Sequence, residues 1–208
     1  SKAVMVTAPV MVLLYDRVFL AGSVRAAWRH RKGLYLGLAA TWGLLVVLLA
    51  PLVYTPPPSA GFILKGITPV DYAVTQPGVI LHYLTLAVWP HSLVLDYVWP
   101  VARTADNILL PVLVIAALGL MTLLSLRHRP ALGFLGAWFF LVLAPTSSVI
   151  PLGDLAFEHR MYLPLAAVTA LIVISGWRLL RRLVPADQVR LPLAASLVIT
   201  LVVVLAAV

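Results

Sequence analysis

The sequence contains no cysteine and very little charge. Without cysteine, a disulfide, a thiolate metal site and a thiol nucleophile are all excluded. Charged residues make up 11% of the chain and apolar residues 62%, whereas about a quarter of a soluble domain is charged. A core of 208 residues has no room for so much apolar surface. Lipid must therefore be the solvent, and the sequence predicts an all-α integral membrane protein.

Several motifs of catalytic sites are also missing. The sequence has no glycine-rich phosphate loop, no Gly-x-Ser-x-Gly, no His-Glu-x-x-His and no run of intramembrane acids typical of a proton relay. No cofactor motif and no complete set of metal ligands is visible, so the use of a divalent metal stays open. The residues alone offer no nucleophile beside an obvious general base.

Apolar runs predict a polytopic helical bundle with about six spanning helices. The predicted segments are a partial helix at Ala3–Leu20, followed by Leu34–Tyr54, Ile108–Leu126, Ala131–Ile150, Met161–Trp177 and Leu191–Val208. Both ends of the sequence fall inside apolar runs. We therefore expect residues 1–208 to form a single membrane domain that is a fragment of a longer chain.

The basic residues predict how the bundle is oriented. Ten of the fifteen lysines and arginines fall in three groups, Arg25/Arg29/Arg31/Lys32, Arg127/Arg129 and Arg178/Arg181/Arg182/Arg190. These groups lie on one side if each predicted segment crosses once, and the positive-inside rule makes that side cytoplasmic. The net charge of +8 is then a topology signal, and no nucleic-acid partner is expected. We expect a bacterial inner-membrane protein with Asp154–Arg160 on the extracytoplasmic side.

One apolar segment does not fit this alternation. Gly78–Pro100 is long enough to cross, but a crossing there would abolish the charge bias. We interpret it as a re-entrant or interfacial helical element on the outer face. The preceding stretch, Thr55–Gln76, is predicted to be an outer connection held extended by its prolines.

A short polar stretch, Asp154–Arg160, separates two apolar runs. If the next helix extends back through it, Asp154, Glu158 and Tyr162 share one helix face. An arginine at the membrane boundary can hold a phosphate in a bidentate manner, and a nearby carboxylate can orient it. The alternative is an Arg160 that snorkels and pairs with Glu158, with the other charges solvated.

A second polar group contains His82, His91, Asp96 and Tyr97. Its spacing is too loose to predict a metal site, and anchoring at the interface is the stronger interpretation. Asp96, beside aromatic residues, would suit sugar binding if it faces a cavity. Asp16 and Arg17 are expected to form a structural ion pair at the end of the first helix.

Three segments carry a family resemblance. LAPTSSVIPLGDLAFEHRMYLPLAAV, around Glu158, Arg160, Tyr162, Leu163 and Pro164, resembles the Glu-x-Arg-x-Tyr-Leu-Pro signature of the transmembrane and tetratricopeptide-repeat O-mannosyltransferase family, in its bacterial relatives. YAVTQPGVILHYLTLAVWPHSLVLDYVWP resembles the upstream Trp-Pro and Asp-Tyr segment, and SKAVMVTAPVMVLLYD resembles the Ser-Lys-Glu helix, although Ala3 replaces the glutamate.

The resemblance implies part of a GT-C-type fold and a glycosyltransferase that moves a sugar, mannose in this family, from a polyprenyl-phosphate carrier to a protein or glycan acceptor. It implies that the catalytic acid precedes Ser1 and that the C-terminal repeats are not present in this sequence. The stretch Asp154–Tyr162, which includes His159, would line the donor pocket. Arg160 would contact phosphate, and Glu158 and Tyr162 would orient it or contact the sugar. Asp96 and Tyr97 are expected among the substrate-binding residues as well.

A second class of function stays open. In this second class, the chain is a non-catalytic membrane subunit that packs against other subunits of a larger complex. A helix and an outer loop with paired acids upstream of Ser1 would favour the enzyme. A transporter is less well supported, because charged residues avoid the predicted helix centres.

Overall fold

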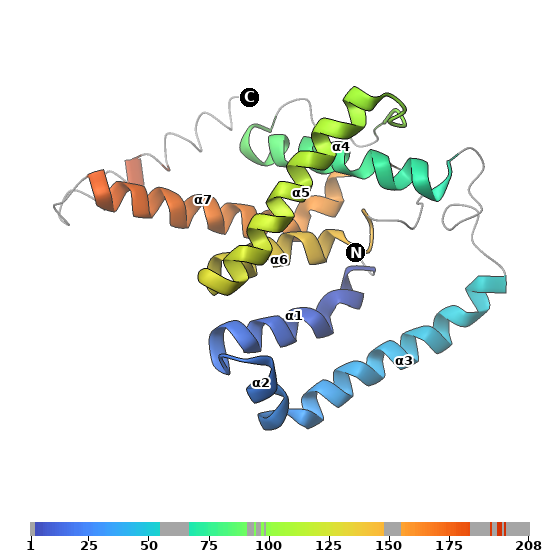
Figure 1. Ribbon diagram of the computed structural model, residues 1–208, viewed down its shortest axis with the longest axis vertical. Helices are drawn as coiled ribbons and strands as arrows, with labels where there is room; N and C mark the ends of the chain where they lie inside the picture. The colour runs from blue at the N-terminus through green and yellow to red at the C-terminus, as the bar shows by residue number, and fades with distance from the viewer. Residues whose placement is uncertain are drawn as a thin grey trace.

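The computed structural model describes residues 3–54, 67–90, 94, 97, 99–147, 155–183, 192, 195, 196 and 198. These residues are all-helical, and no strand occurs among them (Figure 1). The elements are η1 (Ala3–Thr7), α1 (Ala8–Tyr15), η2 (Asp16–Leu20), α2 (Val24–His30), α3 (Lys32–Tyr54), α4 (Pro69–Val88), α5 (Ala105–His128), α6 (Pro130–Leu143), η3 (Glu158–Met161) and α7 (Tyr162–Leu183). The span predicted at Leu191–Val208 lies almost entirely outside the described residues.

Two helical stretches, Ala105–His128 and Glu158–Leu183, are long and apolar enough to cross a membrane. The pair Val4–Leu20 and Val24–His30, bent by 103°, adds a third if it is one span. The apolar stretches Lys32–Leu48 and Pro130–Leu143 are shorter. The described residues therefore support an integral membrane protein with two or three candidate spans, fewer than the six predicted.

The helix predicted at Ala131–Ile150 ends earlier, at Leu143, so its predicted C-terminal bound is wrong. The chain turns immediately afterwards, where Thr146 N and Ser147 N both donate to Leu143 O, at 3.0 and 2.9 Å. Pro145 contributes to the stop, because it has no N–H to continue the ladder of helical hydrogen bonds.

The boundary between the predicted outer connection and the interfacial helix is also wrong. Helix α4 begins at Pro69, inside the stretch predicted to be extended. A capping box starts it: Asp71 N donates to Thr68 Oγ1 and Thr68 N donates to Asp71 Oδ2, both at 3.1 Å. The helix ends before Pro90. It is not among the helices long and apolar enough to span. Its interfacial or re-entrant placement stays a prediction.

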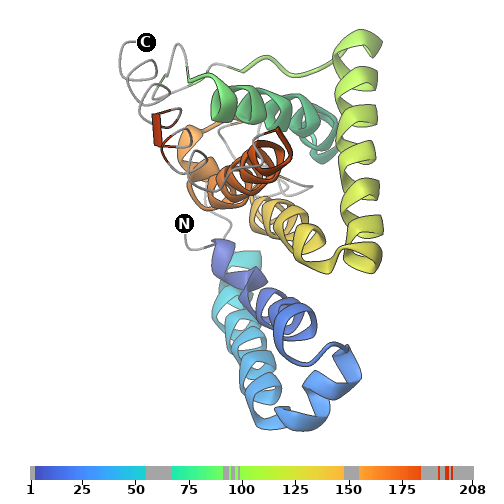
Figure 2. The same cartoon turned by 90° about the vertical axis from the view of Figure 1, so that its left-hand side faces the viewer.

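Helices α4, α5, α6 and α7 share one apolar core (Figure 1). Its buried members are Val79, Ile80, Tyr83, Phe139, Leu143, Ala156, Met161 and Ala167. Helices α5 and α6 form an antiparallel hairpin that turns at Arg129. Figure 2 shows α1, α2 and α3 as a second group below these helices. Phe134 joins the groups, because its ring contacts those of Tyr15 and Phe19 at 5.9 and 5.2 Å.

The ion pair predicted between Asp16 and Arg17 is not the one formed. Asp16 is 2% exposed and pairs with Arg31, 2.9 Å from Nη1 to Oδ1. The Tyr35 hydroxyl donates to Asp16 Oδ2 at 2.5 Å. Gly22, whose φ of 71° suits a residue without Cβ, forms the bend that brings α2 back toward Asp16. Asp16 therefore ties the end of α1 to the start of α3.

Candidate functional site

Arg160 lies inside a polar cluster at one end of α4, α6 and α7. Its side chain is 9% exposed. Nη1 lies 3.3 Å from each of three oxygens, the Tyr72 hydroxyl and the carbonyls of Thr146 and Leu155. The guanidinium carbon also stands 5.8 Å from the centre of the Phe157 ring. Such burial rules out an arginine that snorkels to water, so that interpretation of Arg160 is wrong.

Helix α4 holds the segment around Arg160 in place. The Tyr72 hydroxyl donates to Thr146 O at 2.6 Å, and Gln76 Nε2 donates to Leu155 O at 3.2 Å. About two turns further along the helix, the Tyr83 hydroxyl accepts from Phe157 N at 2.6 Å. These three side chains are buried and recur on one face of α4. The sequence analysis predicted none of these three as site residues. Tyr72 and Gln76 fall in the stretch that it predicted to be an extended loop.

Glu158 connects the same turn to the segment before α5. Its Oε1 accepts from the Tyr97 hydroxyl at 2.6 Å and from Val94 N at 2.9 Å. Glu158 and Tyr97 were both predicted as site residues, and the fold brings them into contact although 61 residues separate them. The carboxylate therefore fixes the loop to the first turn of the α7 stretch.

The remaining predicted site residues are exposed or lie outside the described residues. Tyr162 is 81% exposed, and His159 is exposed with its ring 5.0 Å from that of Phe157. Asp154 and Asp96 lie outside the described residues. The helix shared by Asp154, Glu158 and Tyr162 is not formed, because the backbone of residues 155–157 is not helical and a 3-10 turn precedes α7.

A pocket of about 240 Å³ adjoins Glu158, between α4 and the start of α7. Tyr83, Leu86, Ala87, Pro90, Met161 and Leu165 form the rest of its wall. The pocket is largely apolar, and Glu158 and Tyr83 are the side chains in its wall that can hydrogen-bond a ligand. A sugar hydroxyl placed there would find a carboxylate already oriented by Tyr97.

The histidines do not assemble a metal site within the described part of the chain. No group of three His, Cys, Asp or Glu side chains there could hold a metal ion. The His82 ring instead packs against Tyr97 and Trp99, at 5.3 and 5.0 Å between ring centres. His91 lies outside the described residues. Anchoring by His82 at the membrane interface stays a prediction.

The contact between Tyr97 and Glu158 should make the stability of the fold depend on pH. Burial raises the pKa of Tyr97 to about 12, and the hydrogen bond to the Glu158 carboxylate and its negative charge add to this. A raised pKa means that the contact stabilises the fold fully below pH 10 and loses its contribution between pH 10 and about 12. In Glu158→Gln, the pKa of Tyr97 should fall toward 10 without reaching it, because burial remains.

Tyrosine-selective ¹³C NMR titration of the protein in detergent micelles measures this pKa, and Tyr97→Phe assigns the resonance. Tyr162→Phe is the matched control, since that side chain is exposed and its removal should leave the other titrations unchanged. A Tyr97 that titrates near pH 10 in the unmodified protein would contradict the half-buried hydrogen bond to Glu158.

Comparison of the chain with protein-family models, with curated proteins and with solved structures yields no match.

Proposed function

We propose that the chain is the membrane part of a GT-C-type glycosyltransferase. It takes a sugar, mannose by the resemblance, from a polyprenyl-phosphate carrier and transfers it to a protein or glycan acceptor at the outer face of a bacterial inner membrane. The observation that carries the proposal is the gathering of the resembling segments. Glu158 and Arg160 meet Tyr72 and Tyr97 at one end of the helices, beside a pocket.

Each residue then has a distinct role in the proposed site. Glu158, on the pocket wall, binds sugar hydroxyls. His159 and Tyr162, both exposed, face the donor from outside. Arg160 lies beneath them, and its charge stabilises the phosphate that leaves as the sugar is transferred. Its hydrogen bonds to Thr146 and Leu155 also hold the turn that presents Glu158.

The test is sugar transfer by the full-length protein in membranes, with polyprenyl-phosphate mannose as donor. Arg160→Lys keeps the charge but cannot reach all of its acceptors, so turnover should fall by about tenfold or more. Arg29→Lys, an exposed position on α2, is the matched control and should leave turnover unchanged. His159→Ala and Tyr162→Ala should raise KM for the donor with less effect on kcat.

Membrane insertion, followed by the amount of protein in the membrane fraction, should be the same for all four variants. Arg160→Ala is avoided because it would open a void under Phe157. Wild-type turnover in all of the site variants would overturn the site assignment.

A non-catalytic subunit remains the second candidate function. It is favoured because two residues of the motif, Glu158 and Arg160, already form hydrogen bonds with the protein's own backbone. Purified full-length protein separates the two functions. An enzyme transfers sugar when it is reconstituted alone, whereas a subunit transfers none until the other subunits of its complex are added.

A further inference from the structure

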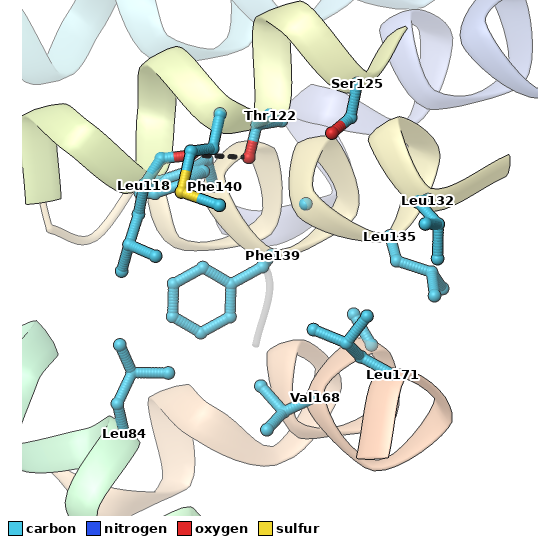
Figure 3. A pocket seen from close by; sticks show the side chains of 13 residues that line it. Leu84, Leu118, Thr122, Ser125, Leu132, Leu135, Phe139, Phe140, Val168 and Leu171 are labelled. Atoms are coloured by element: carbon cyan, nitrogen blue, oxygen red, sulfur yellow. Dashed lines mark hydrogen bonds between the residues drawn. The ribbon is translucent and has the colours of Figure 1, made fainter. Parts of the chain in front are cut away.

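An open apolar groove runs between α5, α6 and α7 and reaches α4. Its volume is about 310 Å³, and Figure 3 shows side chains from these helices converging on its centre. Its lining is Leu84, Leu118, Met121, Thr122, Ser125, Leu132, Leu135, Gly136, Phe139, Phe140, Ala167, Val168 and Leu171. Met121 and Leu171 are 62% and 44% exposed, so the groove opens on the outer surface of the two candidate spans.

The lining offers almost nothing polar to a ligand inside the groove. Thr122 is one of two hydroxyl side chains there, and it donates to Leu118 O at 2.9 Å, as Figure 3 shows. The other is Ser125, near the end of α5. An occupant of the groove must therefore be a hydrocarbon.

One end of the groove lies beside exposed positive charge. Ser125 and Leu132 flank the α5–α6 turn, which carries Arg127, His128 and Arg129. Helix α7 runs antiparallel to α6, since Trp138 Nε1 donates to Leu163 O at 3.0 Å while Leu132 and Leu171 share the groove. The last turns of α7 therefore extend toward the same end, and they add three arginines. The exposed arginines of this end are Arg127, Arg129, Arg178, Arg181 and Arg182.

None of these five arginines forms an ion pair with a carboxylate among the described residues. An apolar groove that ends at unpaired cations matches one chemistry, a hydrocarbon chain attached to an anionic head group. Basic clusters at the ends of spanning helices bind acidic phospholipids in this way. We infer that the α5–α6–α7 groove binds an anionic phospholipid of the surrounding membrane, with an acyl chain in the groove and the phosphate at Arg127 and Arg129.

The inference is tested on the purified full-length protein by native mass spectrometry after exchange into detergent with added lipid. Phosphatidylglycerol and phosphatidylcholine with identical acyl chains are the probes. We expect phosphatidylglycerol to be retained and phosphatidylcholine to be lost. Removing two charges near an anionic head group should weaken retention by roughly tenfold or more, so Arg127→Gln/Arg129→Gln should release the lipid. Arg25→Gln/Arg29→Gln, on the other exposed basic segment, is the matched control and should retain it.

The groove itself is tested by Leu171→Trp, which fills it from the rim, against Ile172→Trp, a neighbouring position outside the lining. Only the first should reduce phosphatidylglycerol retention. Equal retention of the two lipids, equal loss in both arginine pairs, or full retention in Leu171→Trp would each overturn the inference. It would also be overturned if equimolar polyprenyl phosphate displaced the phospholipid, since the groove would then belong to the sugar donor, or if a second copy of the chain occupied the groove.

Discussion

Replacing Gly133 by alanine is expected to destabilise the protein by about 3 kcal/mol, because the new methyl group has no space between α5 and α6. A Cβ at this position would overlap Leu126 N and stand 2.5 Å from Leu126 Cα. Both atoms are backbone, so no side-chain rotation relieves the overlap and the two helices must separate. Their hairpin supplies Phe139 and Leu143 to the core under the candidate site. The damage should therefore spread beyond the turn.

Unfolding in detergent micelles, followed by circular dichroism as SDS is added, measures this loss. Gly119→Ala is the matched control, because it lies in α5 with nothing within 4 Å of a new Cβ. A third variant distinguishes backbone from side-chain overlap. In Gly136→Ala, the new Cβ would overlap side-chain atoms of Thr122, Oγ1 above all. Thr122→Ala should rescue Gly136→Ala, while nothing comparable rescues Gly133→Ala. Equal stability of Gly133→Ala and Gly119→Ala would contradict this close contact.

The long apolar helices could be predicted from sequence because charge marks their ends. Helix α5 follows closely from its apolar run, which Asp106 precedes and Arg127 follows. Helix α4 could not be predicted in the same way, since its first half contains Asp71, Gln76 and Pro77 and resembles a polar loop. Its start was nevertheless encoded locally. Thr68 and Asp71 have the spacing of a capping box, a signal that sequence analysis passed over.

The candidate site was predictable only where its residue types were unusual. Glu158 and Tyr97 were singled out as polar groups between apolar runs, and they are in contact. Their surroundings were not predictable, because Tyr72 and Tyr83 resemble ordinary interfacial aromatics in sequence. What makes them part of the site is a tertiary contact, across 88 residues for Tyr72 and Arg160 and across 74 for Tyr83 and Phe157. No repeating pattern in the local sequence indicates a contact between residues so far apart in the chain.

The same limit explains the error at Asp16, and it leads to the second large expected effect. Asp16 was predicted to pair with Arg17 because the two opposite charges are adjacent in the sequence. The side chains of consecutive residues in a helix, however, point in different directions. The bend at Gly22 instead brings Arg31 to the carboxylate. Asp16 is almost completely buried, whereas Arg31 is 44% exposed. The two partners should therefore differ in what their removal costs.

Arg31→Met should cost about 2 to 3 kcal/mol, somewhat less than a fully buried pair, because it leaves a carboxylate buried with Tyr35 as its remaining neutral donor. Asp16→Asn should cost less, since an amide can accept from Tyr35 and the released Arg31 can reach solvent or lipid head groups. The double variant should be more stable than Arg31→Met alone, because the buried charge is then gone. Arg29→Met, an exposed neighbour on α2, is the control for the loss of a positive charge.

SDS unfolding of the unmodified protein, the two single variants and the double variant forms a double-mutant cycle in which the sign of the interaction decides the interpretation. A double variant less stable than either single variant, with additive losses, would show that Asp16 and Arg31 act independently. Rescue of Arg31→Met by Asp16→Asn would show that the buried charge, and not the lost arginine contacts, is what the fold cannot accommodate. The connection between α1 and α3 would then depend on neutralising Asp16, which is why a group as exposed as Arg31 can still stabilise the fold.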